Sequence, residues 1–182
     1  MATPALKEWS AAVHAMLDGR QTVLLRKGGI GEKRFDLTAS EFVFFPTIAH
    51  GHAERVRPEH RDLLDASASD STESTLVLRA GASVVAAVAV NRPEALEAIA
   101  DTHIWTDESV HADRVDFRPK HRLTVLVVSV RPLVAPVTVH RTPDYAGCKS
   151  WVDLDVDPSM GDPVHDEATL AAVADRVRAS VG

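Results

Sequence analysis

The chain has 182 residues, 45% of them hydrophobic and 25% charged, a size and composition that fit one globular domain and exclude a disordered or fibrous protein. The formal net charge of −6 argues against a protein that coats nucleic acid electrostatically, because that affinity comes from an excess of positive charge. No apolar run reaches the roughly 18 residues of a membrane-spanning helix. A single cysteine, Cys148, excludes an internal disulfide and a cysteine-based zinc cluster.

The first half of the chain is expected to contain two helices, two strands and a polar loop. Apolar residues at spacings of three and four predict an amphipathic helix over residues 5–17. Residues 21–26 and 41–47 are rich in β-branched and aromatic side chains and predict two strands. A short helix that starts at a proline is predicted over residues 58–64, and a mobile loop rich in serine and aspartate over residues 65–75.

The second half of the chain is richer in strands. Small apolar residues over 76–90 predict two consecutive strands, or one strand bent at Gly81, buried on both faces. Thr106 has the position of a helix N-cap, with acidic residues in the turn that follows. The remaining predicted elements are helices over 92–100 and 166–180 and strands over 122–133 and 135–141.

These elements predict the fold class and the domain organisation. Strands and helices are mixed without the regular alternation of a doubly wound sheet, so we expect an α+β fold with a strand-rich core, flanking helices and a C-terminal helix. Residues 1–182 are expected to form a single domain, with a main body over 1–152 and an acidic linker plus the C-terminal helix over 153–182. Lys7 and Glu8 stand where a signal peptide would be apolar, which predicts a cytoplasmic protein without a membrane partner.

Positive charge is concentrated in two parts of the sequence. The glycine-rich stretch that follows Arg26 and Lys27 is compatible with a plain hairpin turn and with an anion-binding loop, and it lacks the ending of a nucleotide-binding P-loop. Strand alternation would place Arg26 and Lys27 on opposite faces as long as the strand persists. The two clusters are Arg20, Arg26, Lys27, Lys33 and Arg34, and then Arg114, Arg118, Lys120 and Arg122.

Nine histidines raise the possibility of a metal site, but none has a familiar ligand spacing, so we predict no metal and no cofactor. His50 and His103 are instead candidates for a general base, because histidine titrates near neutral pH. Glu8 or Glu32 would orient that base. Trp105 would either stack on a nucleobase or cover the core. Cys148, beside Lys149, is either a nucleophile or a small residue in a turn.

Five motifs in order resemble the bacterial domain of unknown function 1802 family. The resemblance covers residues 5 to about 151, implies that residues 1–152 are the family core, and implies no activity. The motifs are "ALKEW", "GRQTVLLRKGGIGE", "FPTIAHGH" with "RPEHRDLL", "HIWTDE" with a following arginine, and "GCKSW".

A second resemblance concerns the fold. The stretch "DGRQTVLLR" is similar to the Gly-x-Lys-Thr…Arg segment of ASCH domains, which belong to the PUA-like barrels, with Gln21 in place of the lysine. This likeness implies a barrel-like core and a cleft, lined by basic and aromatic residues, that binds RNA or modified nucleotides. The residues it makes candidates for ligand binding are Arg26, Lys27, His50, Trp105 and Arg114, to which the basic cluster adds Lys120.

Three functions are compatible with the sequence. The leading hypothesis is a domain that binds RNA, a nucleotide or another phosphate-bearing ligand through this cleft. The second is a hydrolase or nuclease in which His50 or His103 is the general base. The third is a protein-interaction module whose partner the sequence does not identify.

Overall fold

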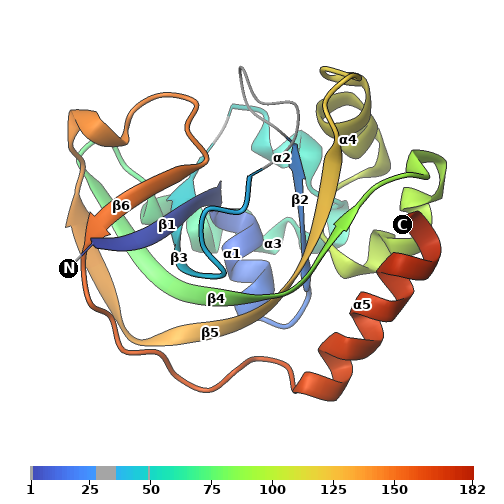
Figure 1. Cartoon of the computed structure of the whole chain (residues 1–182). Helices are drawn as coiled ribbons and strands as arrows, with labels where there is room; N and C mark the ends of the chain where they lie inside the picture. The colour runs from blue at the N-terminus through green and yellow to red at the C-terminus, as the bar shows by residue number, and fades with distance from the viewer. Residues whose placement is uncertain (1, 28–35, 49) are drawn as a thin grey trace.

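The computed structural model describes residues 2–27, 36–48 and 50–182, and its centre is a curled six-stranded sheet (Figure 1). The strands lie in the order β2-β5-β4-β3-β1-β6; β1 and β3 run parallel, and every other neighbouring pair is antiparallel. Their bounds are β1 (Ala2–Trp9), β2 (Val23–Lys27), β3 (Glu41–Thr47), β4 (Thr75–Ala89), β5 (Leu123–His140) and β6 (Trp151–Asp155).

Short helices fill the connections, and the fold class is the expected mixed α+β. The α-helices are α1 (Ser10–Leu17), α2 (His52–Arg55), α3 (Asp62–Ser67), α4 (Asp107–Val110) and α5 (Glu167–Val181). Segments of 3₁₀-helix cover Pro58–His60, Ala68–Asp70, Pro93–Thr102 and Pro143–Tyr145, and a π-helical segment covers His111–Asp116. Among the described residues, no helix is long and apolar enough to cross a membrane.

The sheet curls around α1 but does not close into the expected barrel. In the described part of the chain no ladder joins the edge strands β2 and β6. The curl nevertheless brings β2 to β1, because Arg26 Nη1 donates to the carbonyl of Lys7 at 3.0 Å although three strands separate β2 from β1. Three fully buried alanines of α1, Ala11, Ala12 and Ala15, keep the helix thin enough for the sheet to wrap around it.

The predicted helix over residues 5–17 is wrong for its first half, which is strand β1. Ala5 and Leu6 point to opposite faces of β1, yet both are fully buried, in two different clusters of the core. A strand buried on both faces has no polar alternation. Because β1 continues directly into α1, the apolar residues of the two elements together have spacings of three and four, which imitate one long helix.

The predicted mobile loop over residues 65–75 is also wrong in its first part. Residues 65–67 belong to α3 and residues 68–70 to a 3₁₀ segment. Asp70 is only 2% exposed: its carboxylate accepts Arg79 Nε at 2.8 Å and lies 2.5 Å from His14 Nε2. We call these three residues the Asp70 network. Polar residues of this segment bond to specific buried partners, and composition alone does not distinguish such a segment from a solvated loop.

The strands and helices of the second half lie close to their predicted positions. The apolar run from residue 76 forms one strand, β4, and the two predicted strands from residue 122 form the single strand β5. The ladder between β4 and β5 is interrupted where Leu78 pairs with Val137 and Ala80 with Pro132, so the prolines mark a bulge and not a strand end. Thr106 Oγ1 accepts Ser109 N–H at 3.2 Å, which confirms the predicted N-cap.

The C-terminal helix is confirmed, and the strand before it was not predicted. Leu170, Ala174 and Val177 of α5 are buried, and α5 lies against β4 and β5 (Figure 1). Strand β6 pairs with β1 and alternates buried Val152 and Leu154 with exposed aspartates. The same alternation is present in the sequence, but the many acidic side chains of this segment led to the prediction of a linker.

Candidate functional site

A cleft of about 490 Å³ opens where the C-terminal ends of β1, β2 and β3 meet the end of the π-helical segment and the loop before β6. Because β1 and β3 are parallel and pair Trp9 with Thr47, both strands end at this cleft. Within the described part of the chain, six cationic side chains line it, against one acidic side chain, Glu8. The six cations are Lys7, Arg26, Lys27, Arg114, Arg118 and Lys149.

Glu8 and Arg26 form an ion pair in this cleft. Glu8 is only 4% exposed, and its Oε2 lies 3.3 Å from Arg26 Nη1. The other carboxylate oxygen, Oε1, accepts Trp9 N–H at 2.8 Å. Glu8 is therefore neutralised by an arginine, and the other cations give the described lining of the cleft an excess of positive charge.

Lys27 holds the end of the π-helical segment. Its Nζ donates to the carbonyl oxygens of Arg114 at 2.7 Å, Val115 at 3.1 Å and Phe117 at 2.5 Å. Burial lowers the pKa of Lys27, and nearby Arg114 lowers it further while Asp116 opposes the shift. Its three N–H bonds are used within the protein, so Lys27 can contribute charge to a ligand but few direct hydrogen bonds.

Arg114 differs from its neighbours because its guanidinium has no hydrogen-bond acceptor within the part of the chain that the structure describes. Burial lowers the pKa of Arg114; Arg26 lowers it too, whereas Glu8 raises it. A guanidinium offers five N–H donors in a planar fork that matches the oxygens of a phosphate or carboxylate. Arg114 is therefore a partly buried donor that has no acceptor among the described residues and lines a cationic cleft.

Lys7 connects β1 to the loop that precedes β6. Its Nζ donates to the carbonyl oxygens of Tyr145 at 2.6 Å and Gly147 at 3.0 Å, and lies 5.4 Å from the centre of the Phe45 ring. Burial lowers the pKa of Lys7, and the nearby Arg141 lowers it further. Cys148 and Lys149 are exposed on this loop and line the rim of the cleft.

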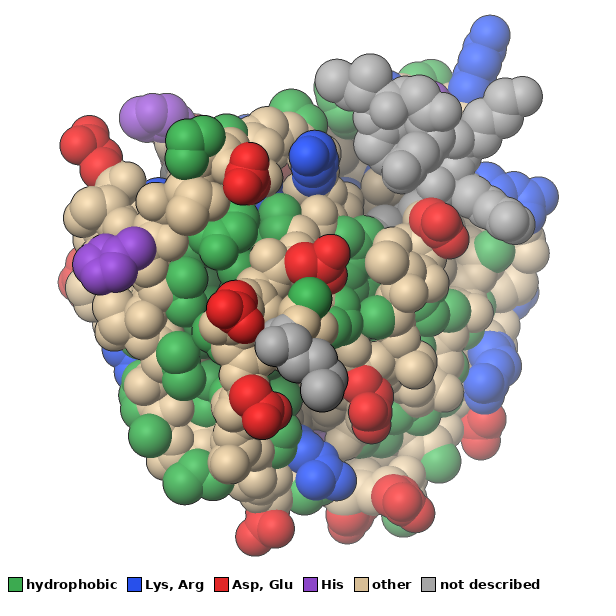
Figure 2. Space-filling view, turned by 60° about the vertical axis from the view of Figure 1, so that its left-hand side comes forward, with side chains coloured by type: hydrophobic (Ala, Val, Ile, Leu, Met, Phe, Trp, Pro, Cys, Tyr) green, Lys and Arg blue, Asp and Glu red, His purple; other side chains and the backbone are tan. Residues whose placement is uncertain are grey.

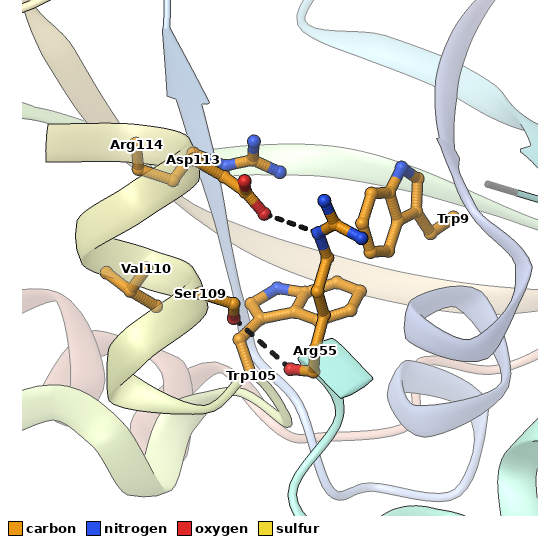
Figure 3. A pocket seen from close by; sticks show the side chains of 7 residues that line it. All are labelled: Trp9, Arg55, Trp105, Ser109, Val110, Asp113 and Arg114. Atoms are coloured by element: carbon orange, nitrogen blue, oxygen red, sulfur yellow. Dashed lines mark hydrogen bonds and ion pairs between the residues drawn. The ribbon is translucent and has the colours of Figure 1, made fainter. Parts of the chain in front are cut away.

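A layer of aromatic side chains lies behind the cleft. The rings of Trp9 and Trp105 meet edge to face, with centres 4.9 Å apart, and His52 lies 4.6 Å from Trp9. Figure 3 shows the guanidinium of Arg55 between Asp113 and Trp9; it bonds the carboxylate at 2.7 Å and lies 5.6 Å from the Trp9 ring. The space between these residues is only about 10 Å³, so the layer supports the cleft and does not itself admit a ligand.

The structure places the predicted site residues in three different environments. Arg26, Lys27, Glu8 and Arg114 line the cleft together. Trp105 is buried in the aromatic layer behind it, so Trp9 is the indole that lines the cleft. The other candidates are distributed as follows: His103 is buried, His50 and Lys120 are exposed and are not among the residues that line the cleft, and Glu32, Lys33 and Arg34 lie outside the described residues with the glycine-rich stretch.

The predicted general base His103 is packed into the interior. Its Nδ1 accepts Trp105 N–H at 3.1 Å, and burial, assisted by the charge of Arg57, lowers the pKa of His103 to about 3. Burial and Arg55 likewise lower the pKa of His52 to about 4. Among the described residues, no group of three or more His, Cys, Asp or Glu side chains is arranged to hold a metal ion.

Positive charge in the cleft contrasts with negative charge elsewhere on the molecule. On the face shown in Figure 2, acidic side chains are spread over the centre, whereas Lys and Arg stand mostly at the margins. A separate groove is lined by Glu59, Glu97, Asp101, Asp107 and Glu108 with one cation, Arg57. The net charge of −6 therefore conceals a strongly cationic site.

Sequence reasoning missed several residues of the cleft. Trp9 lies within the helix predicted over residues 5–17, and neither Lys7 nor Lys149 was among the predicted ligand-binding residues. The signal for Arg118 was present in the second basic cluster. The convergence of these residues depends on how the sheet curls, which the spacing of residues along the chain does not specify.

Comparisons with known proteins place the chain in a family and give a distant structural likeness. Crystal structures of the ASCH protein from Zymomonas mobilis match with a TM-score of 0.46 and 15% identity, over 74% of this chain and 71% of that chain. Two mutants of the same protein match with TM-scores of 0.45 and 0.44, at 16% and 17% identity, over 74% of this chain and 72% and 73% of theirs. No curated protein matches the sequence.

The sequence profile of a domain of unknown function, DUF1802, matches residues 5–176. This range includes most of β1, all of β2 to β6, every described cation of the cleft and most of α5. The chain therefore belongs to the DUF1802 family.

Proposed function

We propose that the cleft binds a phosphate-bearing ligand, RNA or a nucleotide. The observation that carries this proposal is that, among the described residues, six cations converge on one cleft with a single, already paired acid. The volume of about 490 Å³ falls within the range of roughly 300 to 1,000 Å³ that is usual for small-molecule sites.

Each part of the cleft has a role in this proposal. Arg114 donates to phosphate oxygens, because its guanidinium has no acceptor among the described residues. Lys7, Arg118 and Lys149 add positive charge around the rim. The acidic remainder of the surface repels nucleic acid, which confines binding to the cleft.

Fluorescence anisotropy with a labelled single-stranded RNA, at low and at moderate salt, tests the proposal. Wild-type protein is expected to bind at low salt and to lose affinity as salt rises, because phosphate contacts release counterions. Arg114→Gln is expected to bind about tenfold more weakly, since a hydrogen bond to a charged group contributes roughly 1.5 to 3 kcal/mol.

Arg178→Gln is the matched control, because Arg178 is exposed on α5 and, among the described residues, its side chain pairs only with the nearby Asp175. Its affinity is expected to equal that of the wild type. Absence of wild-type binding at low salt, or an equal loss in both variants, would overturn the proposal.

A further inference from the structure

Phe117 is an exposed aromatic residue at the wall of the cleft. Its side chain is 56% exposed, whereas the other described phenylalanines, Phe42, Phe44 and Phe45, are at most 2% exposed. It lines the cleft next to Arg114 and Arg118. A single exposed apolar side chain is ordinary on a protein surface, so the position of this ring beside the cations is the informative observation.

The backbone around Phe117 is held firmly. Lys27 Nζ donates to the carbonyl of Phe117 and to two carbonyls of the preceding π-helical turn. Arg118 has φ of 51°, and it is the only non-glycine residue with positive φ in the described ranges. Such a conformation is unfavourable for an ordinary L-residue, and it persists only where the surrounding contacts impose it.

The side chain of Arg118 completes this arrangement. Its guanidinium lies 5.0 Å from the centre of the Phe117 ring, within the range of a cation–π contact. Lys27 therefore fixes the backbone and Arg118 lies over the ring, so an aromatic ring with a large exposed area stands in one place before any ligand arrives. A fixed ring loses little conformational entropy when a second ring stacks on it.

We infer that Phe117 is a stacking platform for a nucleobase, and that the ligand of the cleft is a single-stranded oligonucleotide. This inference rests on the proposed function and makes it more specific. Stacking on aromatic side chains beside a cationic groove is how proteins bind single strands with little sequence preference, because every base has a π-face. A duplex does not offer such a face, since its bases are already stacked on one another.

Binding of four proteins to three labelled probes tests the inference. The proteins are the wild type, Phe117→Ala, Phe117→Leu and Phe117→Trp; Leu keeps the apolar character without a ring, and Trp keeps a ring. The probes are a short single-stranded RNA, the DNA of the same sequence, and an abasic strand of the same length and charge. Because more than half of the side chain is exposed, these substitutions leave the core intact.

Phe117→Ala and Phe117→Leu are expected to bind the RNA, the DNA or both about tenfold more weakly than the wild type, while Phe117→Trp retains the affinity. All four proteins are expected to bind the abasic strand equally. Comparing the losses on RNA and on DNA identifies which sugar the site accepts.

Two outcomes would overturn the inference: an unchanged affinity of Phe117→Ala for both RNA and DNA, or the same loss on the abasic strand. These outcomes differ from failure of the proposed function, in which the wild type binds none of the three probes. Equal binding by all four proteins of the RNA and the DNA as well as the abasic strand would leave the phosphate site and remove only the platform.

Discussion

The cleft and the Asp70 network both place charged groups at least partly out of solvent, but they balance them differently. In the network, Arg79 Nε and His14 Nε2 bond to the buried carboxylate of Asp70, so both of its oxygens have a partner. In the cleft, the described lining has six cations and one acid, and Arg114 has no acceptor among those described residues. The difference suggests that the balanced charges hold the fold together, whereas the excess charges serve a ligand.

The first prediction concerns the substitution of Asp70, the central residue of the Asp70 network. Asp70→Ala is expected to lower the free energy of unfolding by about 3 kcal/mol, because it leaves the partners of a buried carboxylate uncompensated. Urea denaturation would measure the loss. Asp153→Ala is the control, since Asp153 is exposed on β6 and its removal is expected to change stability by less than about 0.5 kcal/mol.

The folded Asp70→Ala protein is expected to retain its affinity for the RNA strand, because the network is not part of the cleft lining. A stable Asp70→Ala variant that had lost RNA affinity would reverse the assignment of roles to the two regions.

The second prediction concerns the aromatic layer, where buried histidines are neutral. The folded pKa of His103 is about 3 and that of His52 about 4, both below the unfolded value near 6.5. As pH falls below about 6.5, the unfolded chain therefore binds protons that the folded chain does not, and stability is lost down to the folded pKa values. The contribution of these neutral histidines to the free energy of unfolding is fully present above about pH 6.5.

His103→Asn measures this effect, because the shorter side chain does not titrate and carries an oxygen that can accept Trp105 N–H. Between pH 7 and pH 4 the wild type is expected to lose roughly 3 kcal/mol more than the variant, as judged by urea denaturation at each pH. Identical acid sensitivity of the two proteins would show that His103 is not held neutral.

Much of the fold follows from local patterns, and the exceptions have physical causes. Apolar periodicity located β2, β3, β4, β5 and α5 to within a few residues. It failed at β1, where both faces are buried, and at β6, where exposed aspartates dominate the composition. Around Asp70, polar residues with buried partners gave the same pattern as a solvated loop.

The site was predictable in its charges and not in its geometry. The two basic clusters contain Arg26, Lys27, Arg114 and Arg118, which the curled sheet brings to one cleft. The sequence did not indicate that backbone carbonyl groups accept the hydrogen bonds of the Lys27 ammonium. It also did not indicate that Trp9 lines the cleft while Trp105 packs behind it. The first fact depends on the contact between β2 and the π-helical segment, which are more than 80 residues apart in the chain.

Thermal unfolding of the wild type and Arg114→Gln, each with and without the single-stranded RNA, tests the central claim most directly. Because burial disfavours the charged form of Arg114 and its guanidinium has no acceptor among the described residues, its removal is expected to leave the Tm unchanged or higher without ligand. The RNA is expected to raise the Tm of the wild type more than that of the variant, because a ligand stabilises the state it binds. An equal rise in both proteins, or a lower Tm of the variant without ligand, would contradict the claim that Arg114 is reserved for a phosphate.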